Sequence, residues 1–234
     1  MTREQYLERV DKAKNIVFFG GAGVSTESGI PDFRSVDGLY NQKYKYPPEE
    51  ILSAPFFYSH TEEFYKFYFE KMICLSAKPN AAHLKLSEWE RAGKLKAIVT
   101  QNIDGLHQDA GSRNVFELHG SVRRNYCLEC GKEFPLDYIL RTAPKVPKCN
   151  KCGCTVKPDV VLYGEGLPSD TVDGAIEAIA SADMLIVGGT SLTVYPAAGL
   201  IRYFRGNPDN LILINMTPIP EFNNSLCGKI GELL

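Results

Sequence analysis

Four of the seven cysteines stand in two pairs whose spacing is that of a metal site. Cys127 and Cys130 form one Cys-x-x-Cys pair, and Cys149 and Cys152 form the second after eighteen intervening residues. This spacing is typical of a zinc site with thiolate ligands. Four thiolates complete a tetrahedral site and leave no open position at which a water could react. The pattern therefore predicts one structural Zn²⁺, with Cys154 as an alternative fourth ligand.

His119 is the histidine whose position best suits acid–base chemistry. It follows the apolar run 115–118 and precedes Gly120, which places it at the end of an expected strand. The ordinary pKa of imidazole lies close to neutral pH, as a general base requires. His83 lies within a helical pattern and is expected to pack, whereas the spacing of His107 does not separate a functional from a structural role.

Glycines and small polar residues follow four short apolar runs. Any one of these ends could be an ordinary turn, because the same residue types dominate turns. Four together indicate a ligand crevice, since ligands of open α/β sheets bind beyond the carboxyl ends of the strands. The runs are 16–19, 97–100, 184–187 and 211–214, and they are followed by residues 20–25, 101–104, 188–191 and Asn215.

The first of these turns contains Gly21 and Gly23, which would let backbone N–H groups approach an anion closely. As a dinucleotide fingerprint the turn is incomplete, because Thr26 occupies the place of the third glycine. The acidic residue that ordinarily holds a ribose about 20 residues further on is also missing. The sequence therefore suggests a dinucleotide that is bound otherwise than in the common dehydrogenases.

The four runs are apolar throughout rather than alternating, which is typical of strands buried on both faces of a parallel sheet. Strands that alternate with helices predict a doubly wound α/β fold. Two further strand candidates are residues 115–118 and 160–163, and helical patterns occupy residues 1–14, 80–91, 169–180 and 197–204.

Two stretches interrupt this alternation. One is rich in aromatic residues and prolines, and the other holds most of the cysteines. Both are expected to be insertions that together form a smaller second domain. The predicted large domain comprises residues 1–38, 73–121 and 158–234, and the predicted small domain comprises residues 39–72 and 122–157.

Composition narrows the class of protein. The net charge of −2 and the pI near 6.1 argue against a general nucleic-acid binder, which usually carries a basic excess. No stretch approaches the ~20 apolar residues of a membrane helix, and the polar first fourteen residues do not resemble a secretory leader. We expect a cytoplasmic protein that binds neither nucleic acid nor membranes. In a reducing compartment its cysteines bind metal or remain free thiols.

Taken together, these residues resemble the sirtuin family of NAD-dependent protein deacylases. The paired cysteines lie between the fourth and fifth matching segments, as in that family, and the resemblance runs from about residue 15 to about residue 215. The matching segments are GAGVS at 21–25, GIPDFR at 29–34, TQNIDGLH at 100–107, LHG at 118–120, VVLYGE at 160–165 and GTSL at 189–192.

The resemblance implies a Rossmann-like parallel-sheet domain with a smaller inserted domain made of a helical part and a zinc ribbon. NAD and an acyl-lysine peptide would enter the cleft between the two domains. The residues that the resemblance assigns to NAD are Gly21, Ala22, Phe33, Arg34, Gln101, Asn102, Ile103, Asp104, Gly189, Ser191 and Asn215. Those that it assigns to the acyl-lysine and its peptide backbone are Phe33, Val161, Gly164, Glu165 and Val194, the edge residues pairing as in β-augmentation.

The activity implied by the resemblance is transfer of the acyl group from lysine to ADP-ribose, with release of nicotinamide. Asn102 and Asp104 would hold nicotinamide, and His119 would act as general base. Two other classes stay open. A mono-ADP-ribosyltransferase would use the same NAD chemistry, and a non-catalytic NAD-sensing or zinc-ribbon module would need neither a base nor a nicotinamide pocket.

The resemblance also offers a hypothesis on the acyl group. Family members that prefer succinyl or malonyl lysine carry a Tyr-x-x-Arg pair in the small domain, whose arginine binds the distal carboxylate. The corresponding residues here are Tyr65 and Tyr68, so the tyrosine is kept and the arginine is absent. We therefore expect a deacetylase that tolerates longer apolar acyl chains and removes succinyl groups poorly. The alternative is that both tyrosines only pack the small domain.

Overall fold

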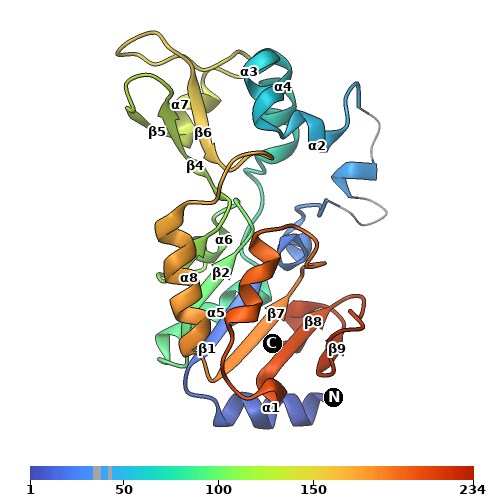
Figure 1. Cartoon of the computed structure of the whole chain (residues 1–234). Coiled ribbons are helices and arrows are strands. Elements are labelled where there is room, and N and C mark those ends of the chain that lie inside the picture. The colour runs from blue at the N-terminus through green and yellow to red at the C-terminus, as the bar shows by residue number, and fades with distance from the viewer. Residues whose placement is uncertain (34–37, 42–43) are drawn as a thin grey trace.

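The computed structural model describes residues 1–33, 38–41 and 44–234. A six-stranded sheet forms the lower half of the molecule in Figure 1, and neighbouring strands run parallel throughout, in the order β3-β2-β1-β7-β8-β9. Sequence order reverses on either side of β1, as in a doubly wound fold. The strands are β1 (Ile16–Gly20), β2 (Leu95–Thr100), β3 (Val115–Glu117), β7 (Met184–Gly188), β8 (Leu211–Asn215) and β9 (Ser225–Cys227).

Both faces of this sheet are covered, which is why its strands are apolar at successive positions. Ile16 and Phe18 of β1 pack into one hydrophobic cluster, and Val17 and Phe19 pack into another on the opposite face. The first cluster includes residues of α1 (Arg3–Lys12), α5 (Ala81–Arg91) and α9 (Ile230–Leu233). The second includes residues of α8 (Ser169–Ser181) and of the 3₁₀ helix η5 (Ala197–Tyr203).

The two helices with the clearest sequence signals begin at side-chain caps. The Thr2 hydroxyl accepts from Gln5 N and the Gln5 side chain accepts from Thr2 N, a capping box that begins α1 within the expected helical pattern of residues 1–14. Asn80 accepts from the N–H groups of Ala82 and His83, and so begins α5. Because unpaired N–H groups at a helix start must find acceptors, these caps fix where each helix begins.

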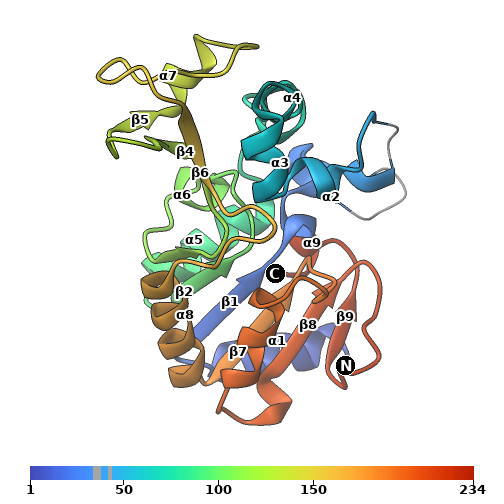
Figure 2. The same ribbon diagram turned by 45° about the horizontal axis from the view of Figure 1, so that its top comes forward.

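The small domain stands above the carboxyl ends of the parallel strands, and Figure 2 shows it as two parts side by side. The ribbon is an antiparallel sheet in the order β5-β4-β6, and a short helix follows β5 along the chain. The helical part consists of α2 (Pro48–Ile51), α3 (Ala54–Ser59), α4 (Thr61–Phe67) and the π-helix η4 (Tyr68–Met72), and the ribbon consists of β4 (Gly120–Cys127), β5 (Glu133–Pro135), α7 (Leu136–Leu140) and β6 (Val156–Val160).

A single hydrophobic cluster joins these two parts. It contains Phe57, Phe64 and Tyr65 from the helical part, and Val122 and Val156 from the ribbon. The observed α/β architecture with a helical and zinc-ribbon insertion confirms the predicted fold class. The domain boundaries remain a prediction, and the limits placed after residues 121 and 157 fall within β4 and β6.

Two local expectations are corrected, and two short elements were not expected. Residues 160–163 do not form a strand of the parallel sheet: Val160 ends β6 of the ribbon, and Tyr163 makes only an isolated bridge to Ser53. An apolar run indicates that a strand is buried but does not indicate which strand it pairs with, and here the partner is β4. The helix expected at 197–204 is a 3₁₀ helix over Ala197–Tyr203. The strand β9 and the helix α9 are too short to leave a periodic pattern.

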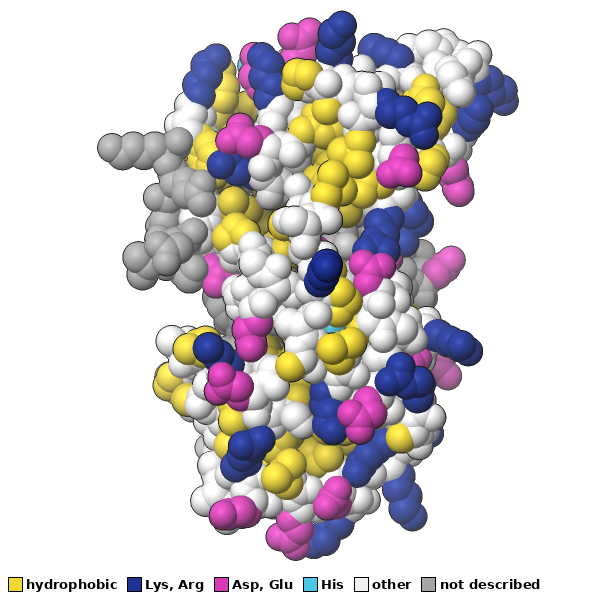
Figure 3. Space-filling model, turned by 180° about the vertical axis from the view of Figure 1, so that it is seen from behind, with side chains coloured by type: hydrophobic (Ala, Val, Ile, Leu, Met, Phe, Trp, Pro, Cys, Tyr) yellow, Lys and Arg dark blue, Asp and Glu magenta, His cyan; other side chains and the backbone are white. Residues whose placement is uncertain are grey.

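The remaining short elements are four 3₁₀ helices and one α-helical turn. They are η1 (Ala22–Val24), η2 (Thr26–Ser28), η3 (Leu39–Asn41), α6 (Leu106–Asp109) and η6 (Pro208–Asn210). Within the described ranges, no helix has the length and apolar character needed to cross a bilayer. The face in Figure 3 carries lysines and arginines interspersed with acidic residues, as the small net charge leads one to expect.

Candidate active site

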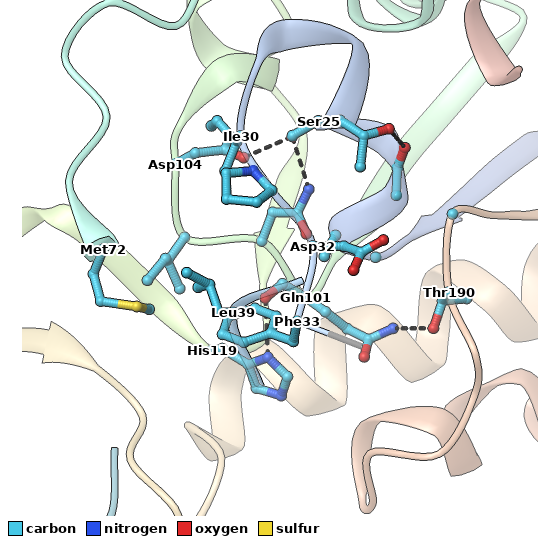
Figure 4. A pocket seen from close by; sticks show the side chains of 18 of the residues that line it. Ser25, Ile30, Asp32, Phe33, Leu39, Met72, Gln101, Asp104, His119 and Thr190 are labelled. Carbon is cyan, nitrogen blue, oxygen red and sulfur yellow. Dashed lines mark hydrogen bonds between the residues drawn. The ribbon is translucent and has the colours of Figure 1, made fainter. Parts of the chain in front are cut away.

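A cavity of about 1010 Å³ lies where the carboxyl ends of the parallel strands meet the small domain (Figure 4). Every residue that the sequence assigned to NAD or to the acyl-lysine peptide lines it, apart from Arg34, which lies outside the described residues. The lining residues from that prediction are Gly21, Ala22, Phe33, Gln101, Asn102, Ile103, Asp104, His119, Val161, Gly164, Glu165, Gly189, Ser191, Val194 and Asn215.

The glycine loop after β1 packs tightly against the loop after β7. The N–H groups of Gly21 and Gly23 donate to the carbonyls of Gly188 and Gly189, at 3.1 and 2.8 Å. A Cβ atom on Gly23 would lie 2.8 Å from Gly189 Cα, closer than carbon atoms normally approach. In this conformation the two N–H groups are therefore used within the protein. The glycines let two loops meet; that they also let backbone N–H groups of the turn approach an anion stays a prediction.

Ser25 joins two of the predicted site residues and was not itself singled out from the sequence. Asn102 Nδ2 donates to Ser25 Oγ at 3.0 Å, and Ser25 Oγ donates to Asp104 Oδ2 at 2.7 Å. Asp104 Oδ1 also accepts from Leu106 N at 2.8 Å, so the carboxylate is held at both oxygens. Figure 4 shows the hydrogen bonds of Ser25 at one side of the cavity. A serine at the end of a glycine-rich turn was the only sequence signal for it.

His119 is held by a bond to the backbone. Its Nδ1 lies 2.9 Å from the carbonyl oxygen of Gln101, which can only accept, so Nδ1 carries the proton and Nε2 is the basic nitrogen. Burial lowers the pKa of His119, and the bond to the Gln101 carbonyl opposes that shift. The imidazole is therefore held neutral, in a fixed tautomer, at the cavity wall.

The loops after β7 and β8 are tied together through Thr190. Asn215 Oδ1 accepts from Thr190 N at 3.1 Å, and Asn215 Nδ2 donates to Thr190 O at 2.7 Å. The Thr190 hydroxyl accepts from Gln101 Nε2 at 3.1 Å, which connects the loop after β2 to the same group. Thr190 thus organises three strand ends, although sequence reasoning gave it no role.

Tyr65 and Tyr68 are not part of the cavity. Both side chains are 0% exposed and lie within the small-domain cluster, where Tyr65 donates its hydroxyl to the carbonyl of Val156. Tyr68 stacks on Phe64 with ring centroids 5.6 Å apart. This placement contradicts direct contact of either ring with an acyl group. The spacing of the two tyrosines put them on one helix face, but only packing decided that this face turns inward.

The four predicted zinc ligands converge. The sulfur atoms of Cys127, Cys130, Cys149 and Cys152 all lie within 4.8 Å of one another. The Cys130–Cys149 and Cys130–Cys152 separations are 3.7 and 3.6 Å. A tetrahedron with Zn–S bonds of 2.3 Å has edges of about 3.8 Å, so the four sulfur atoms fit this ion. Cys154 is not one of the four, which decides the alternative left open by the sequence.

A glycine follows each Cys-x-x-Cys pair and makes the turn that brings its sulfurs together. Gly131 and Gly153 have φ of +65° and +78°, a backbone region that residues with a Cβ seldom occupy. Their N–H groups donate to the carbonyls of Cys127 and Cys149, at 3.0 and 2.8 Å. An ion held by the four thiolates would close these two turns onto each other and take no part in a reaction.

Comparisons with known proteins agree with this geometry. A family model described as "Sir2 family" matches residues 21–196. The "NAD-dependent protein deacetylase" of Clostridium acetobutylicum is 60% identical over 230 residues, covering 96% of this chain and 93% of that protein. The "NAD-dependent protein deacylase 1" of Archaeoglobus fulgidus is 43% identical over 240 residues, covering 99% and 94%.

Solved structures give the same result. A Sir2 structure described with a deacetylated p53 peptide and 3'-O-acetyl-ADP-ribose has a TM-score of 0.88 and 39% identity, over 99% of this chain and 95% of that one. A Sir2 structure described with a p53 peptide and NAD⁺ has a TM-score of 0.84 and 39% identity, over 99% and 95%. By the extent of the family match and the identity across the whole chain, this protein belongs to the Sir2 family.

Proposed function

We propose that this chain is an NAD-dependent protein-lysine deacetylase, which transfers the acetyl group from lysine to ADP-ribose and releases nicotinamide. The observation that carries the proposal is the meeting of two groups in one cavity. The Asn102–Ser25–Asp104 chain and the neutral imidazole of His119 both line it. Relatives named as NAD-dependent protein deacetylases and deacylases cover nearly the whole chain.

NAD supplies the ribose carbon that becomes electron-poor when the bond to nicotinamide breaks. We assign Asn102, Ile103 and Asp104 to the nicotinamide side of the cavity, where an amide and a carboxylate can bind the carboxamide of that ring. Ser25 holds both polar side chains at set positions before any ligand arrives. Preorganised polar groups of this kind stabilise developing charge because they need not reorganise during the reaction. Keeping water out of this region prevents simple hydrolysis of NAD.

We assign His119 the role of general base. Its Nδ1–H is committed to the Gln101 carbonyl, so Nε2 is the nitrogen that can take a proton from a ribose hydroxyl. The lowered pKa keeps this nitrogen unprotonated at neutral pH. In this sequence the acyl oxygen bonds to the ribose carbon as nicotinamide leaves, and the deprotonated hydroxyl then attacks the acyl carbon of the resulting imidate. Lysine leaves as the protonated amine, one water molecule is consumed, and the acyl group remains on ADP-ribose.

The acyl-lysine is proposed to enter between Phe33 and Val161, with its peptide backbone pairing along Gly164, Glu165 and Val194. All five residues line the same cavity. An extended peptide that is added as a strand gains its affinity from main-chain hydrogen bonds. We further propose a cytoplasmic location and no nucleic-acid or membrane partner, on the strength of composition alone.

The test is a product analysis with purified protein, NAD and an acetyl-lysine peptide. The expected products are nicotinamide, deacetylated peptide and acetylated ADP-ribose in equal amounts, with little NAD consumed when the peptide is omitted. Attachment of ADP-ribose to protein without loss of the acetyl group would favour a mono-ADP-ribosyltransferase instead. Absence of any NAD turnover would favour a binding module and contradict the proposal.

A further inference from the structure

Lys157 is the one lysine among the fully buried residues of the described chain. It lies on β6 in the small domain, and 2% of it is exposed. Lysine is almost never buried to this degree unless its charge is paired. It does not line the cavity and has no part in the proposed chemistry.

The ammonium group of Lys157 bonds to the segment that immediately follows it. Its Nζ donates to the carbonyls of Val160 at 2.9 Å and Pro158 at 3.4 Å, and to Glu165 Oε2 at 3.1 Å. Lys157 also lies over two rings, Phe57 of α3 and Tyr126 of β4, each 5.9 Å from the centroid. One buried cation therefore contacts the helical part, the ribbon and the segment 158–165.

The partner carboxylate closes a turn in that segment. Glu165 Oε2 accepts from Leu162 N at 2.8 Å, and Glu165 N donates to Leu162 O at 2.9 Å. Gly164 lies inside this turn with φ of +92°. The start of the segment is fixed as well, because Val161 N donates to His119 O at 3.0 Å. The turn is thus tied to the proposed base at one end and to Lys157 at the other.

The buried Lys157–Glu165 ion pair could contribute to stability or to conformation. Desolvating two charges offsets much of their attraction, and replacing a buried ion pair by apolar side chains is often neutral or stabilising. A contribution to stability is therefore a weak explanation for Lys157. A contribution to conformation is a stronger one, because the cation and the carboxylate together bond three backbone groups of one short segment: Leu162 N, Pro158 O and Val160 O.

We propose that the Lys157–Glu165 pair is a positioning device for substrate, which holds the backbone of residues 160–165 in the form that receives the acyl-lysine peptide. This inference rests on the proposed function. Lys157 acts through Glu165 and touches neither the peptide nor NAD. It also leaves the Glu165 charge balanced, so the peptide is received by backbone pairing rather than by attraction to a free carboxylate.

The experiment compares Lys157→Met with Lys157→Arg in the full chain, with zinc content and thermal unfolding measured first. Two substrates are used: an acetyl-lysine peptide with residues on both sides, and acetyl-lysine without flanking residues. For Lys157→Met we expect KM for the peptide to rise about tenfold, the effect of losing one hydrogen bond to a charged group. KM for NAD and turnover of acetyl-lysine without flanking residues stay within about twofold, because neither uses the peptide-pairing edge. Lys157→Arg keeps the charge and the donors, and retains KM near wild type.

The matched control is Lys85→Met, because Lys85 also pairs with a glutamate, Glu88 at 3.2 Å, but lies on the exposed surface of α5. It should change no kinetic constant. Any of three results would overturn the inference. The peptide KM of Lys157→Met could be unchanged, its activity could fall equally on both substrates, or Lys157→Arg could show the same rise in peptide KM as Lys157→Met. If Lys157→Met does not fold, Glu165→Gln decides by the same peptide-specific rise. A wild-type chain that leaves the peptide acetylated contradicts the proposed function instead.

Discussion

At His119, one hydrogen bond decides which nitrogen is available for chemistry. The bond from Nδ1 to the Gln101 carbonyl fixes both the tautomer and the ring orientation. Gln101 is itself held through its side chain to Thr190 and through its N–H to Gly20 O, at 2.9 Å. The base is therefore positioned by the ends of β1, β2 and β7 together, and loosening any of these loops would move it.

Replacing His119 by alanine should remove turnover without removing the fold. Loss of a general base costs about 10²–10⁴-fold in rate. The single bond lost is to a backbone carbonyl, so thermal unfolding should shift little, and NAD should still bind. The check is deacetylation of an acetyl-lysine peptide beside calorimetric NAD binding. Deacetylation close to the wild-type rate would contradict the assignment.

Two other histidines are buried and should make the fold sensitive to acid. His83 and His107 have ring centroids 4.7 Å apart, and His107 packs against Phe18. Burial lowers the pKa of His107 to about 3, with a further contribution from His83, whose own pKa is lowered by burial. Between about pH 6.5 and pH 3, His107 therefore binds a proton in the unfolded chain but not in the folded chain.

Because the unfolded chain binds the extra proton, the free energy of unfolding falls as pH falls below about 6.5. Each unit of pH within the window costs about 1.4 kcal/mol for one such group. Between pH 6.5 and pH 5 the wild type should lose about 2 kcal/mol more than His107→Leu in urea unfolding. His60→Leu, at an exposed histidine, is the control and should follow the wild type. Equal losses of stability in all three proteins would contradict this account. Acid also releases zinc, but it does so in all three proteins and therefore does not affect the comparison.

Among the elements, the ribbon depends most on a group outside the polypeptide. Its strand β5 has three residues and α7 has five, so the ribbon has little regular structure beyond β4 and β6. Cys127 and Cys149 are buried, and their turns meet at the four sulfur atoms. Metal binding of this kind contributes directly to folding, because the site does not exist in the unfolded chain.

Substituting Cys127 by alanine should therefore lower stability first and activity only as a consequence. We expect loss of zinc and a thermal unfolding midpoint lowered by several degrees or more, since structural zinc contributes folding energy outright. Metal analysis of the pure protein should give one zinc per chain. The control is Cys154→Ala, which should keep its zinc, because Cys154 lies outside the four-sulfur cluster. A Cys127→Ala protein that keeps both fold and metal would show that the site is something else.

For the whole molecule, the cavity lies between the domains and its walls decide which acyl group fits. Within the described part of the lining, three cationic side chains occur, and each is already paired. Lys71 pairs with Glu70 at 3.0 Å, Lys229 pairs with Glu232 at 3.5 Å, and Arg123 pairs with Asp109. The small-domain end of the cavity also presents apolar side chains, among them Leu52, Met72 and Ile73.

Acetyl and longer apolar acyl groups should therefore be preferred over succinyl. A carboxylate placed at this end would lose its water without gaining a cation, at a cost of several kcal/mol. The measurement is kcat/KM on one peptide bearing acetyl, butyryl or succinyl lysine. As a matched variant, Met72→Arg places a cation in the same wall and should raise succinyl activity relative to acetyl. A wild-type preference for succinyl would refute this prediction and leave the deacylase proposal standing.

By itself the sequence determined the layers and the chemistry that they carry. Four apolar runs specified buried parallel strands, because a strand covered on both faces must be apolar at successive positions. Two Cys-x-x-Cys pairs specified a thiolate site, and the Val115–Glu117 strand placed His119 at a carboxyl end. These features are local in the chain, so spacing and composition were enough to recognise them.

Tertiary structure alone decided how the segments face one another. It turned Tyr65 and Tyr68 into the small-domain core, and it used the N–H groups of Gly21 and Gly23 to pack two loops. It also placed Ser25 between Asn102 and Asp104, across 77 and 79 positions of sequence. Residues so far apart leave no shared pattern in one sequence, because which atoms they meet depends on how separate elements pack, and that packing is settled only when the whole chain folds.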